Sequence, residues 1–300
     1  MKTDVSIILL TKNGGSRLEE LMQSIRTQKY NGKMEVVAID SGSQDGTVEI
    51  LEKYDVELFK IKPEEFHHSK TRNLGAEKSK GDILVYLTQD ALPVDDYFLI
   101  NLLKPFDKEN ADIVYGRQIA NHDAKKMDIF FYSYYYPKKI RVLKKKHAKN
   151  PKKFYMENIF VSDVCSSIKR EVWNNVSFDN DVPMAEDKDF ALRALQAGYK
   201  IIYEPEAAVY HSHDYSLSSL FKRRFKDGAA FASIALEGKD NFVNKGLKYF
   251  LEQMKYFIKN KYFLQLPYAL IYNFVYFFAV FLGNNEKYLP YFIKNSLHRN

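Results

Sequence analysis

The sequence of 300 residues contains one tryptophan and one cysteine, Cys165. A single cysteine excludes an intrachain disulfide, which fits a reducing compartment. No GxGxxG follows the first apolar run, and no GxxxxGKS or GxxxxGKT occurs. The patterns of a dinucleotide-binding site and of a P-loop nucleotidase are therefore both missing. The N-terminal MKTDVSIILLTKNGG has too short an apolar run for a signal peptide, and we expect it to form the first strand.

The chain is instead rich in apolar, aromatic and basic residues. Hydrophobic residues make up 46%, enough for a sizeable core, and the 22 Tyr and 22 Phe gather towards the C-terminal half. The net charge is +7, and a dense basic run, KKIRVLKKKHAKNPKK, covers residues 138–153. Such a run suits an anionic partner, which means nucleic acid, a phospholipid surface or a diphosphate substrate. A solvated, mobile loop explains it equally well.

The first two thirds of the chain alternate apolar runs with helical patterns. Apolar positions 18, 21, 22 and 25 have helical spacing between the first two runs, and further helices are expected near 48–51 and 71–79. The predicted strands cover 5–10, 35–39, 56–61, 83–87, 111–115 and 164–168, with short late strands at 201–203 and 207–210. This alternation predicts βαβ units and a mainly parallel sheet.

The pattern becomes helical, aromatic and basic near residue 215, which predicts two domains, 1–215 and 216–300. The uncharged segment 263–282 would form a helix roughly 30 Å long, close to the thickness of a bilayer. Gln265, Pro267 and Asn273 interrupt it, and lysines flank it. Flanking lysines and many aromatics favour a helix in the membrane interface. A helix buried in a dimer or against the first domain, and a true membrane span, are the alternatives.

Two carboxylates each follow an apolar run that we interpret as a buried strand: Asp40 in VVAIDSGSQDGT and Asp90 in ILVYLTQDALP. A doubly wound sheet presents its ligand site at such strand ends. Asp40, which precedes a Ser/Gly turn, can accept hydrogen bonds from a ribose or a base. Thr11 and Asn13, at the end of the first strand, are placed to line the same crevice, although each alone is better explained as a turn residue.

The carboxylate of Asp90 can bind a hard divalent cation that bridges two phosphates. One aspartate is a poor metal site by itself, and His211 in AAVYHSHD is a candidate second ligand. Mn²⁺ accepts such mixed oxygen and nitrogen ligands. Taken alone, a histidine like His211 is more often structural.

Two further motifs lie at predicted helix starts. Asp187 in MAEDKDFALRALQAGY either caps its helix or acts as a general base, and a capped carboxylate has a low basicity. Arg72 in FHHSKTRNLGA lies beside Asn73, where a cation and a helix end together suit a phosphate. A surface ion pair explains Arg72 equally well.

In this order, the segments resemble the family-two inverting glycosyltransferases of the GT-A fold. The matching segments are SIILLTKN, VVAIDSGSQDGT, FHHSKTRNLGA, ILVYLTQDALP and AEDKDFALRALQAG, within about residues 3–215. FHHSKTRNLGA with YLTQDALP is most similar to the rhamnosyltransferase branch, whose members usually use dTDP-L-rhamnose to build bacterial surface polysaccharides. The resemblance implies an α/β GT-A domain, with a Rossmann-like, mainly parallel sheet flanked by helices. The helical aromatic and basic extension follows it.

The resemblance also implies how the donor is bound. Thr11 and Asp40 would hold a pyrimidine nucleoside, and Arg72 would lie near the base or the diphosphate. Thr88 stands where the family usually has the first acid of its DxD motif, which puts the metal affinity in doubt. The full set of residues expected to contact the nucleotide sugar is Thr11, Asn13, Asp40, Arg72, Asn73, Thr88, Gln89 and Asp90.

The remaining implied roles concern the metal and the chemistry. Asp90 corresponds to the last acid of the DxD motif, and His211 matches a histidine that completes the metal site in some members. Asp187 matches the aspartate of the ED motif, which is the catalytic base. Its neighbour Glu186 is a candidate on the acceptor side.

From these roles we expect a Mg²⁺- or Mn²⁺-dependent inverting transfer of L-rhamnose from dTDP-L-rhamnose to a sugar hydroxyl. The expected acceptor is a lipid-linked precursor of a surface polysaccharide, on the cytoplasmic face of an anionic membrane. A UDP-hexose or UDP-N-acetylhexosamine donor is one alternative. An inactive GT-A module that binds a membrane or a partner chain is another. A nucleic-acid-binding protein has only the charge in its favour and is not expected.

Overall fold

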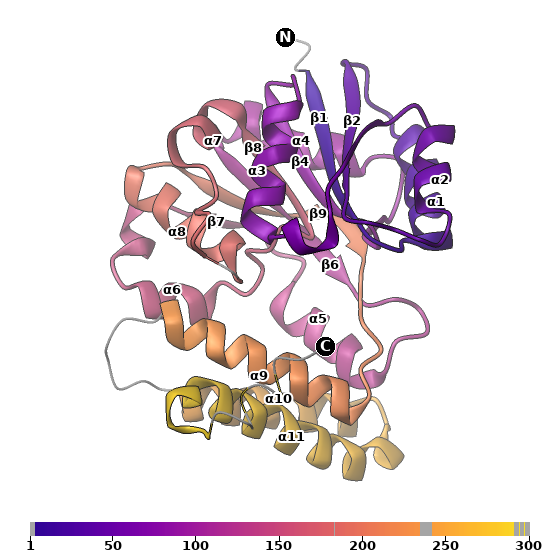
Figure 1. The fold of residues 1–300 in the computed structure, drawn as a ribbon. Helices are drawn as coiled ribbons and strands as arrows, with labels where there is room; N and C mark the ends of the chain where they lie inside the picture. The colour runs from indigo at the N-terminus through magenta and orange to yellow at the C-terminus, as the bar shows by residue number, and fades with distance from the viewer. Residues whose placement is uncertain (1–3, 183, 235–241, 291–293, 295–296, 298–300) are drawn as a thin grey trace. The chain divides into compact units, whose positions relative to one another are not determined.

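The computed structural model describes residues 4–182, 184–234, 242–290, 294 and 297 (Figure 1). The chain divides into two compact units, residues 1–121 with 135–211 and residues 122–134 with 212–300. The second boundary lies close to the predicted division after residue 215. The contribution of residues 122–134 to the second unit has no counterpart in the predicted division.

The first unit is built on one mixed sheet. Its strands are β1 Val5–Thr11, β2 Met34–Asp40, β3 Glu57–Lys60, β4 Ile83–Thr88, β5 Leu92–Pro93, β6 Ile113–Ile119, β7 Arg141–Leu143, β8 Cys165–Lys169 and β9 Ile201–Tyr210. They follow the order β3-β2-β1-β4-β8-β6-β9-β5, and β7 also pairs with β9. Strands β1 to β4 are mutually parallel where they pair, as are β6 and β9. Strand β8 is antiparallel to both neighbours.

Helices cover this sheet. They are α1 Gly15–Arg26, α2 Thr47–Lys53, α3 His68–Lys78, α4 Phe98–Lys108, α6 Pro151–Glu157, α7 Arg170–Val176 and α8 Glu186–Ala197, with short 3₁₀ turns at Pro63–Glu65 and Lys145–Ala148. Helix α3 lies very close to β1, because a Cβ atom at Gly75 would fall 2.4 Å from Ile8. The helix bearing Arg72 therefore needs a glycine at this contact.

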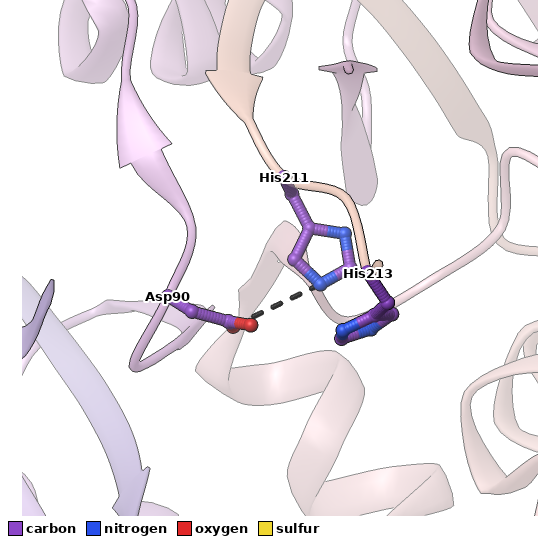
Figure 2. A group of neighbouring side chains, drawn as sticks. All are labelled: Asp90, His211 and His213. Carbon is purple, nitrogen blue, oxygen red and sulfur yellow. Dashed lines mark ion pairs between the residues drawn. The ribbon is translucent and has the colours of Figure 1, made fainter. Parts of the chain in front are cut away.

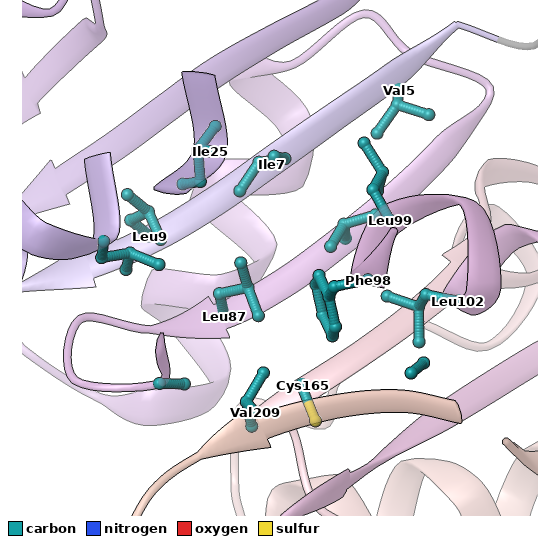
Figure 3. Close-up of a cluster of buried hydrophobic side chains, with 14 of the residues drawn as sticks. Val5, Ile7, Leu9, Ile25, Leu87, Phe98, Leu99, Leu102, Cys165 and Val209 are labelled. Atoms are coloured by element: carbon teal, nitrogen blue, oxygen red, sulfur yellow. The ribbon is translucent and has the colours of Figure 1, made fainter. Parts of the chain in front are cut away.

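The core follows from the apolar runs. Residues of β1 are buried on both faces, as expected for a central parallel strand. Figure 3 shows one cluster in which Val5, Ile7 and Leu9 of β1 pack with side chains from α1 and α4. Cys165, the single cysteine, is buried in the same cluster. The sheet is thus a rigid platform for the residues at its edge.

The predicted α/β architecture is confirmed, but the observed strands differ from the expected ones. The two-residue strand β5 was not predicted. The two late strands form one continuous strand, β9, and its register with β6 shifts where Gly116 pairs with Glu204 but Arg117 pairs with Ala208. The basic run 138–153 is not a mobile loop throughout. Its central residues form β7, which pairs with β9, because Val142 and Leu143 supply an apolar pair within the lysines.

The second unit is helical. Its elements are α5 Lys126–Tyr135, α9 Leu217–Ile234, α10 Phe242–Lys259, α11 Leu266–Asn284 and 3₁₀ turns at Phe263–Gln265 and Glu286–Tyr288. The last residue of α5 belongs to the first unit. Helices α9 and α11 approach closely, since a Cβ atom at Gly283 would fall 2.1 Å from the Phe225 carbonyl oxygen. Asn273 of α11 donates a hydrogen bond to Gln253 of α10, and both side chains are buried.

Candidate active site

One edge of the sheet gathers the candidate residues. Thr11 and Asp40 end β1 and β2 and are paired in register, and Thr88 ends β4 beside them. Strands β6 and β9 end at the same edge, where His211 follows β9. Because β8 runs the opposite way, its beginning lies at this edge too, which brings Asp163 there. The edge is the place where a doubly wound sheet binds its ligand.

Asp40 is buried and is held by donors from its own turn. Its Oδ1 accepts hydrogen bonds from the backbone N–H groups of Gly42 and Ser43, both at 3.0 Å. Its Oδ2 accepts from the hydroxyls of Thr11, at 3.1 Å, and Ser43. Burial acts to raise the pKa of Asp40, but these hydrogen bonds outweigh it and lower the pKa. Asp40 is therefore a fixed carboxylate at neutral pH.

The loops after β1 and β4 are joined by an amide. Gln89 donates from Nε2 to the Lys12 carbonyl and accepts from the Lys12 N–H, both at 2.9 Å. Asn13 has a left-handed backbone, and its side-chain oxygen accepts from the Gln44 N–H at 2.9 Å. These bonds fix the loops that carry Asn13 and Gln89 at this edge of the sheet. Their predicted contact with a nucleotide sugar stays a prediction.

Arg72 lies in a buried cluster of charges. Its Nη1 donates to Glu186 Oε1, and its Nε lies 3.4 Å from Asp163 Oδ2. The side chains of Arg72, Glu186 and Asp163 are only 9%, 7% and 0% exposed. An exposed ion pair, the plain alternative for Arg72, is therefore wrong. The pairing of Glu186 with Arg72 favours a role in holding the ED segment over contact with the acceptor.

Asp187 follows Glu186 in the first turn of α8 and is half-buried. The residue before the helix, Ala185, has a left-handed backbone with φ 61°. Burial, and then the negative charge of Glu186, raise the pKa of Asp187, although its Oδ1 accepts a hydrogen bond from the Lys188 N–H. The expected low basicity of a capped carboxylate is thus wrong for this residue. A raised pKa brings Asp187 closer to the value that suits a general base.

Asp163 is one of the residues that sequence reasoning missed. It is fully buried, accepts a hydrogen bond from Ser166 at 2.8 Å, and faces Arg72. Burial raises the pKa of Asp163 to about 7, against the attraction of Arg72, and the charge of Asp187 acts in the same direction as burial. The available signal was a carboxylate directly before the predicted strand 164–168. This signal identifies a site residue only if the strand is known to run antiparallel to its neighbours, because its start then lies at the edge where they end.

The side chain of Asn73 forms hydrogen bonds with other residues of the protein. Its Nδ2 donates to the Phe178 carbonyl and to Asn180 Oδ1, while its Oδ1 accepts from Trp173 Nε1 and from the Phe178 N–H. These four bonds tie α3 to α7 and to the segment after it. The structure therefore favours a structural role for Asn73 over the predicted contact with the nucleotide sugar.

Three side chains form a candidate metal site (Figure 2). Ligand atoms of Asp90, His211 and His213 all lie within 4.8 Å of one another, and His211 Nε2 lies 3.8 Å from Asp90 Oδ1. The antiparallel pairing of β5 with β9 brings the two segments together, since Leu92 pairs with Tyr210. One carboxylate and two imidazoles suit a divalent cation such as Mn²⁺. His213, two residues after His211, was not predicted.

Thr88, in the place of the first DxD acid, has a buried hydroxyl. No hydrogen-bond partner for its Oγ1 occurs among the described residues. Buried polar atoms are normally paired, so an unpaired one next to a candidate ligand site calls for a reason. A hydroxyl here can bond a ligand but adds no negative charge to the metal site.

The chain matches two family models. The model described as Glycosyl transferase family 2 covers residues 6–176, and the model described as Glycosyl transferase family group 2 covers residues 146–292. The chain is 30% identical over 292 residues to the O-antigen chain rhamnosyltransferase RfbN of Salmonella typhimurium. That alignment covers 95% of this chain and 91% of RfbN. The O-antigen chain rhamnosyltransferase WbaN of Salmonella anatum is 31% identical, with 95% and 90% of the two chains covered.

Solved structures show the same fold. A mannosyltransferase from Pyrobaculum calidifontis, in complex with GDP-Man and Mn²⁺, superposes with a TM-score of 0.64 at 19% identity, covering 96% of this chain and 89% of the other. The TarS protein of S. aureus in complex with UDP superposes with a TM-score of 0.55 at 17% identity, covering 81% and 68%. Together with the family models, the ordered strand-end carboxylates and the ED helix, these likenesses lead to one conclusion: the chain belongs to glycosyltransferase family 2 and has the GT-A fold.

Proposed function

We propose that this glycosyltransferase moves L-rhamnose from dTDP-L-rhamnose onto a sugar hydroxyl of a lipid-linked surface-polysaccharide precursor. The observation that carries the proposal is the likeness, along nearly the whole of both chains, to two O-antigen chain rhamnosyltransferases. It extends through the second unit, so it includes more than the shared donor-binding fold. The polar residues at the ends of β1, β2 and β4 form the proposed binding place for the nucleoside.

Asp187 is the proposed base. It accepts the proton of the acceptor hydroxyl while that oxygen attacks the anomeric carbon and the bond from this carbon to the diphosphate breaks. One displacement inverts the configuration, and no covalent intermediate with the protein forms. The raised pKa of Asp187 serves this proton transfer. Arg72 holds Glu186, and thereby the first turn of α8, in place.

The donor set of Asp90, His211 and His213 fits a divalent metal, and we propose that these residues hold Mg²⁺ or Mn²⁺. When bound, such a cation neutralises the charge of the leaving nucleoside diphosphate. Because imidazole nitrogens are softer ligands than carboxylates, we expect Mn²⁺ to support a higher rate than Mg²⁺.

The variant Asp187→Asn tests the base. We expect it to bind dTDP-L-rhamnose with an unchanged Kd in calorimetry, while transfer to an acceptor falls by about 10²- to 10⁴-fold. Asp189→Asn is the matched control, because Asp189 lies on the same helix and is paired with Arg193 at 2.7 Å. Transfer by Asp187→Asn at the rate of the parent enzyme would remove Asp187 from this role.

We also propose that the second unit lies on an anionic membrane surface, at the cytoplasmic face. Among the described residues, one helix, Phe263–Asn284, is long and apolar enough to cross a membrane. Its most apolar stretch of 18 residues has a mean hydropathy of 1.6, and 33% of that stretch is buried. Helix α11 exposes one apolar stripe: Leu270, Ile271, Phe274, Phe278 and Phe281. Its opposite face is buried, with Ala269, Asn273 and Gly283 among the buried residues. One exposed and one buried face favour an interfacial helix over a lipid-surrounded span.

The charge of helix α10 supports the same contact with an anionic membrane surface. Helix α10 exposes Leu247, Leu251 and Ile258 and carries several lysines but one acid, Glu252. We expect Phe274→Glu to reduce co-sedimentation with phosphatidylglycerol vesicles by at least severalfold. Tyr97→Glu is the control, since Tyr97 is a comparably exposed aromatic of the first unit, 57% against 69%. Equal co-sedimentation of the Phe274 variant and the parent would contradict the proposed surface.

A further inference from the structure

His211 stands at the end of a chain of buried hydrogen bonds. The Tyr136 hydroxyl donates to the Ile159 carbonyl at 3.2 Å, and Gln118 Nε2 donates to the Tyr136 oxygen at 2.9 Å. Gln118 Oε1 then lies 2.9 Å from His211 Nδ1. The three residues are nearly inaccessible, with exposed fractions of 3% for Gln118, 4% for Tyr136 and 6% for His211. The chain is therefore shielded from exchange with bulk water.

The carbonyl of Ile159 sets the direction of this chain. A backbone carbonyl can only accept, so the single hydroxyl proton of Tyr136 is given to it. The Tyr136 oxygen must then accept from Gln118, which turns the amide NH₂ towards Tyr136 and the amide oxygen towards the imidazole. An amide oxygen also only accepts, so His211 carries its proton on Nδ1. The lone pair of the neutral ring is then on Nε2, the atom that faces Asp90.

Strands β6 and β9 fix the positions of Gln118 and His211. Gln118 lies on β6 and is paired in register with Val209 of β9. The His211 N–H donates to the carbonyl of Ile119, the next residue of β6, at 2.8 Å. Arg117 donates to the Tyr136 carbonyl at 3.0 Å, so the backbone that carries the tyrosine is also tied to β6. His211 is thus fixed in position by the backbone and in rotation by Gln118.

We propose that Gln118 and Tyr136 are positioning residues that hold His211 as the Nδ1–H tautomer and so present Nε2 to the metal. This inference rests on the proposed metal site. In the opposite tautomer, an Nε2–H group would face the Asp90 carboxylate and would compete with a cation for it. The hydrogen-bond partner of a metal-bound histidine commonly sets its tautomer and its basicity, and removing such a partner weakens metal binding by about 10- to 100-fold.

The first test is Mn²⁺ binding, followed by the loss of the free-ion signal in electron paramagnetic resonance. We expect Gln118→Met, which removes the acceptor, to weaken binding by about 10- to 100-fold. Gln118→Glu keeps an acceptor for Nδ1–H and should restore binding to within about threefold of the parent, since it preserves the bond on which the argument rests. Tyr136→Phe should fall between these two, because it frees the amide to turn over.

Tyr115→Phe is the matched control for the tyrosine variant. Tyr115 is a buried tyrosine of the same strand as Gln118, and no hydrogen-bond partner of its hydroxyl occurs among the described residues. We expect its Mn²⁺ affinity to match that of the parent. Equal affinity in Gln118→Met and the parent would overturn the positioning role.

The second test reads the tautomer directly and needs no metal. Long-range ¹H–¹⁵N spectra of the metal-free protein at pH 8 should show His211 protonated on Nδ1, and Gln118→Met should lose this preference. An Nε2–H tautomer in the parent would overturn the inference while leaving the proposed transfer intact. If the parent protein shows the Nδ1–H tautomer but binds no Mn²⁺, the proposed metal site is wrong. Gln118 and Tyr136 then have no metal ligand to position.

Discussion

Replacing Arg72 by methionine is expected to cost far more than the loss of a surface ion pair. The change removes the guanidinium that faces Glu186 and Asp163 but keeps a long apolar stem. Two nearly inaccessible carboxylates then remain without their cation, close to Asp187. Breaking a buried pair in this way typically costs about 3–5 kcal/mol of unfolding free energy. At about 2–4 °C per kcal/mol, the midpoint of thermal unfolding should fall by about 6–20 °C.

A double-mutant cycle isolates the pair. Glu186→Gln alone and together with Arg72→Met should give an interaction free energy of about 0.5–3 kcal/mol, because each change removes one partner of the same ion pair. Trp173 reports the unfolding well, since it is the only tryptophan and donates from Nε1 to Asn73, the residue after Arg72. Urea unfolding followed by its fluorescence therefore measures the unit that contains the cluster.

The loss of stability caused by Arg72→Met should also depend on pH. Without Arg72, the carboxyl of Asp163 becomes harder to ionise, and a protonated acid tolerates burial better. The cost of Arg72→Met should thus be smaller at pH 5 than at pH 8. Lys53→Met is the control, because the Lys53–Glu19 pair is exposed and should contribute little to stability. Additive losses in the cycle, or a loss for Arg72→Met no larger than for Lys53→Met, would refute the reasoning.

Three further changes have defined outcomes. The pKa of Asp163 is raised to about 7, so its stabilising contribution is present at low pH and is lost as pH rises through about 7. Asp163→Asn should therefore show a smaller fall in thermal midpoint between pH 5 and pH 8 than the parent. Thr88→Val should raise stability by about 1 kcal/mol by removing an unpaired hydroxyl, yet raise the KM for the donor if that hydroxyl binds it. Gly283→Ala should destabilise the α9–α11 contact by about 1–3 kcal/mol, measurable as faster limited proteolysis within residues 217–284.

Local patterns predicted the parallel half of the sheet well. The runs that became β1 and β4 are apolar because these strands are buried on both faces, and β2 is buried over its last four residues. Their ends, and hence Thr11, Asp40 and Thr88, could be placed at one edge from the sequence alone. The start of α8 at Glu186 was also evident, since acidic residues precede a helical apolar pattern.

What the sequence did not reveal depends on pairing between distant segments. The antiparallel course of β8 places Asp163 beside Arg72, and no local pattern distinguishes that course from a parallel one. The two-residue strand β5 brings Asp90 to His211, yet it is too short to leave a periodic signal. Gln118 lies beyond the predicted strand 111–115, and no local pattern links it to Tyr136 or to His211.

The most direct test of the central claim is donor turnover by the purified protein, with and without Mn²⁺, across dTDP-L-rhamnose, UDP-glucose, UDP-galactose and UDP-N-acetylglucosamine. The proposed function predicts Mn²⁺-dependent release of dTDP from the rhamnose donor and little release from the three UDP sugars. Preferential turnover of a UDP sugar would contradict the rhamnose assignment while leaving the fold and the base in place. Turnover of none of the four, together with no binding of dTDP or UDP in the same samples, would contradict catalysis itself and favour an inactive module.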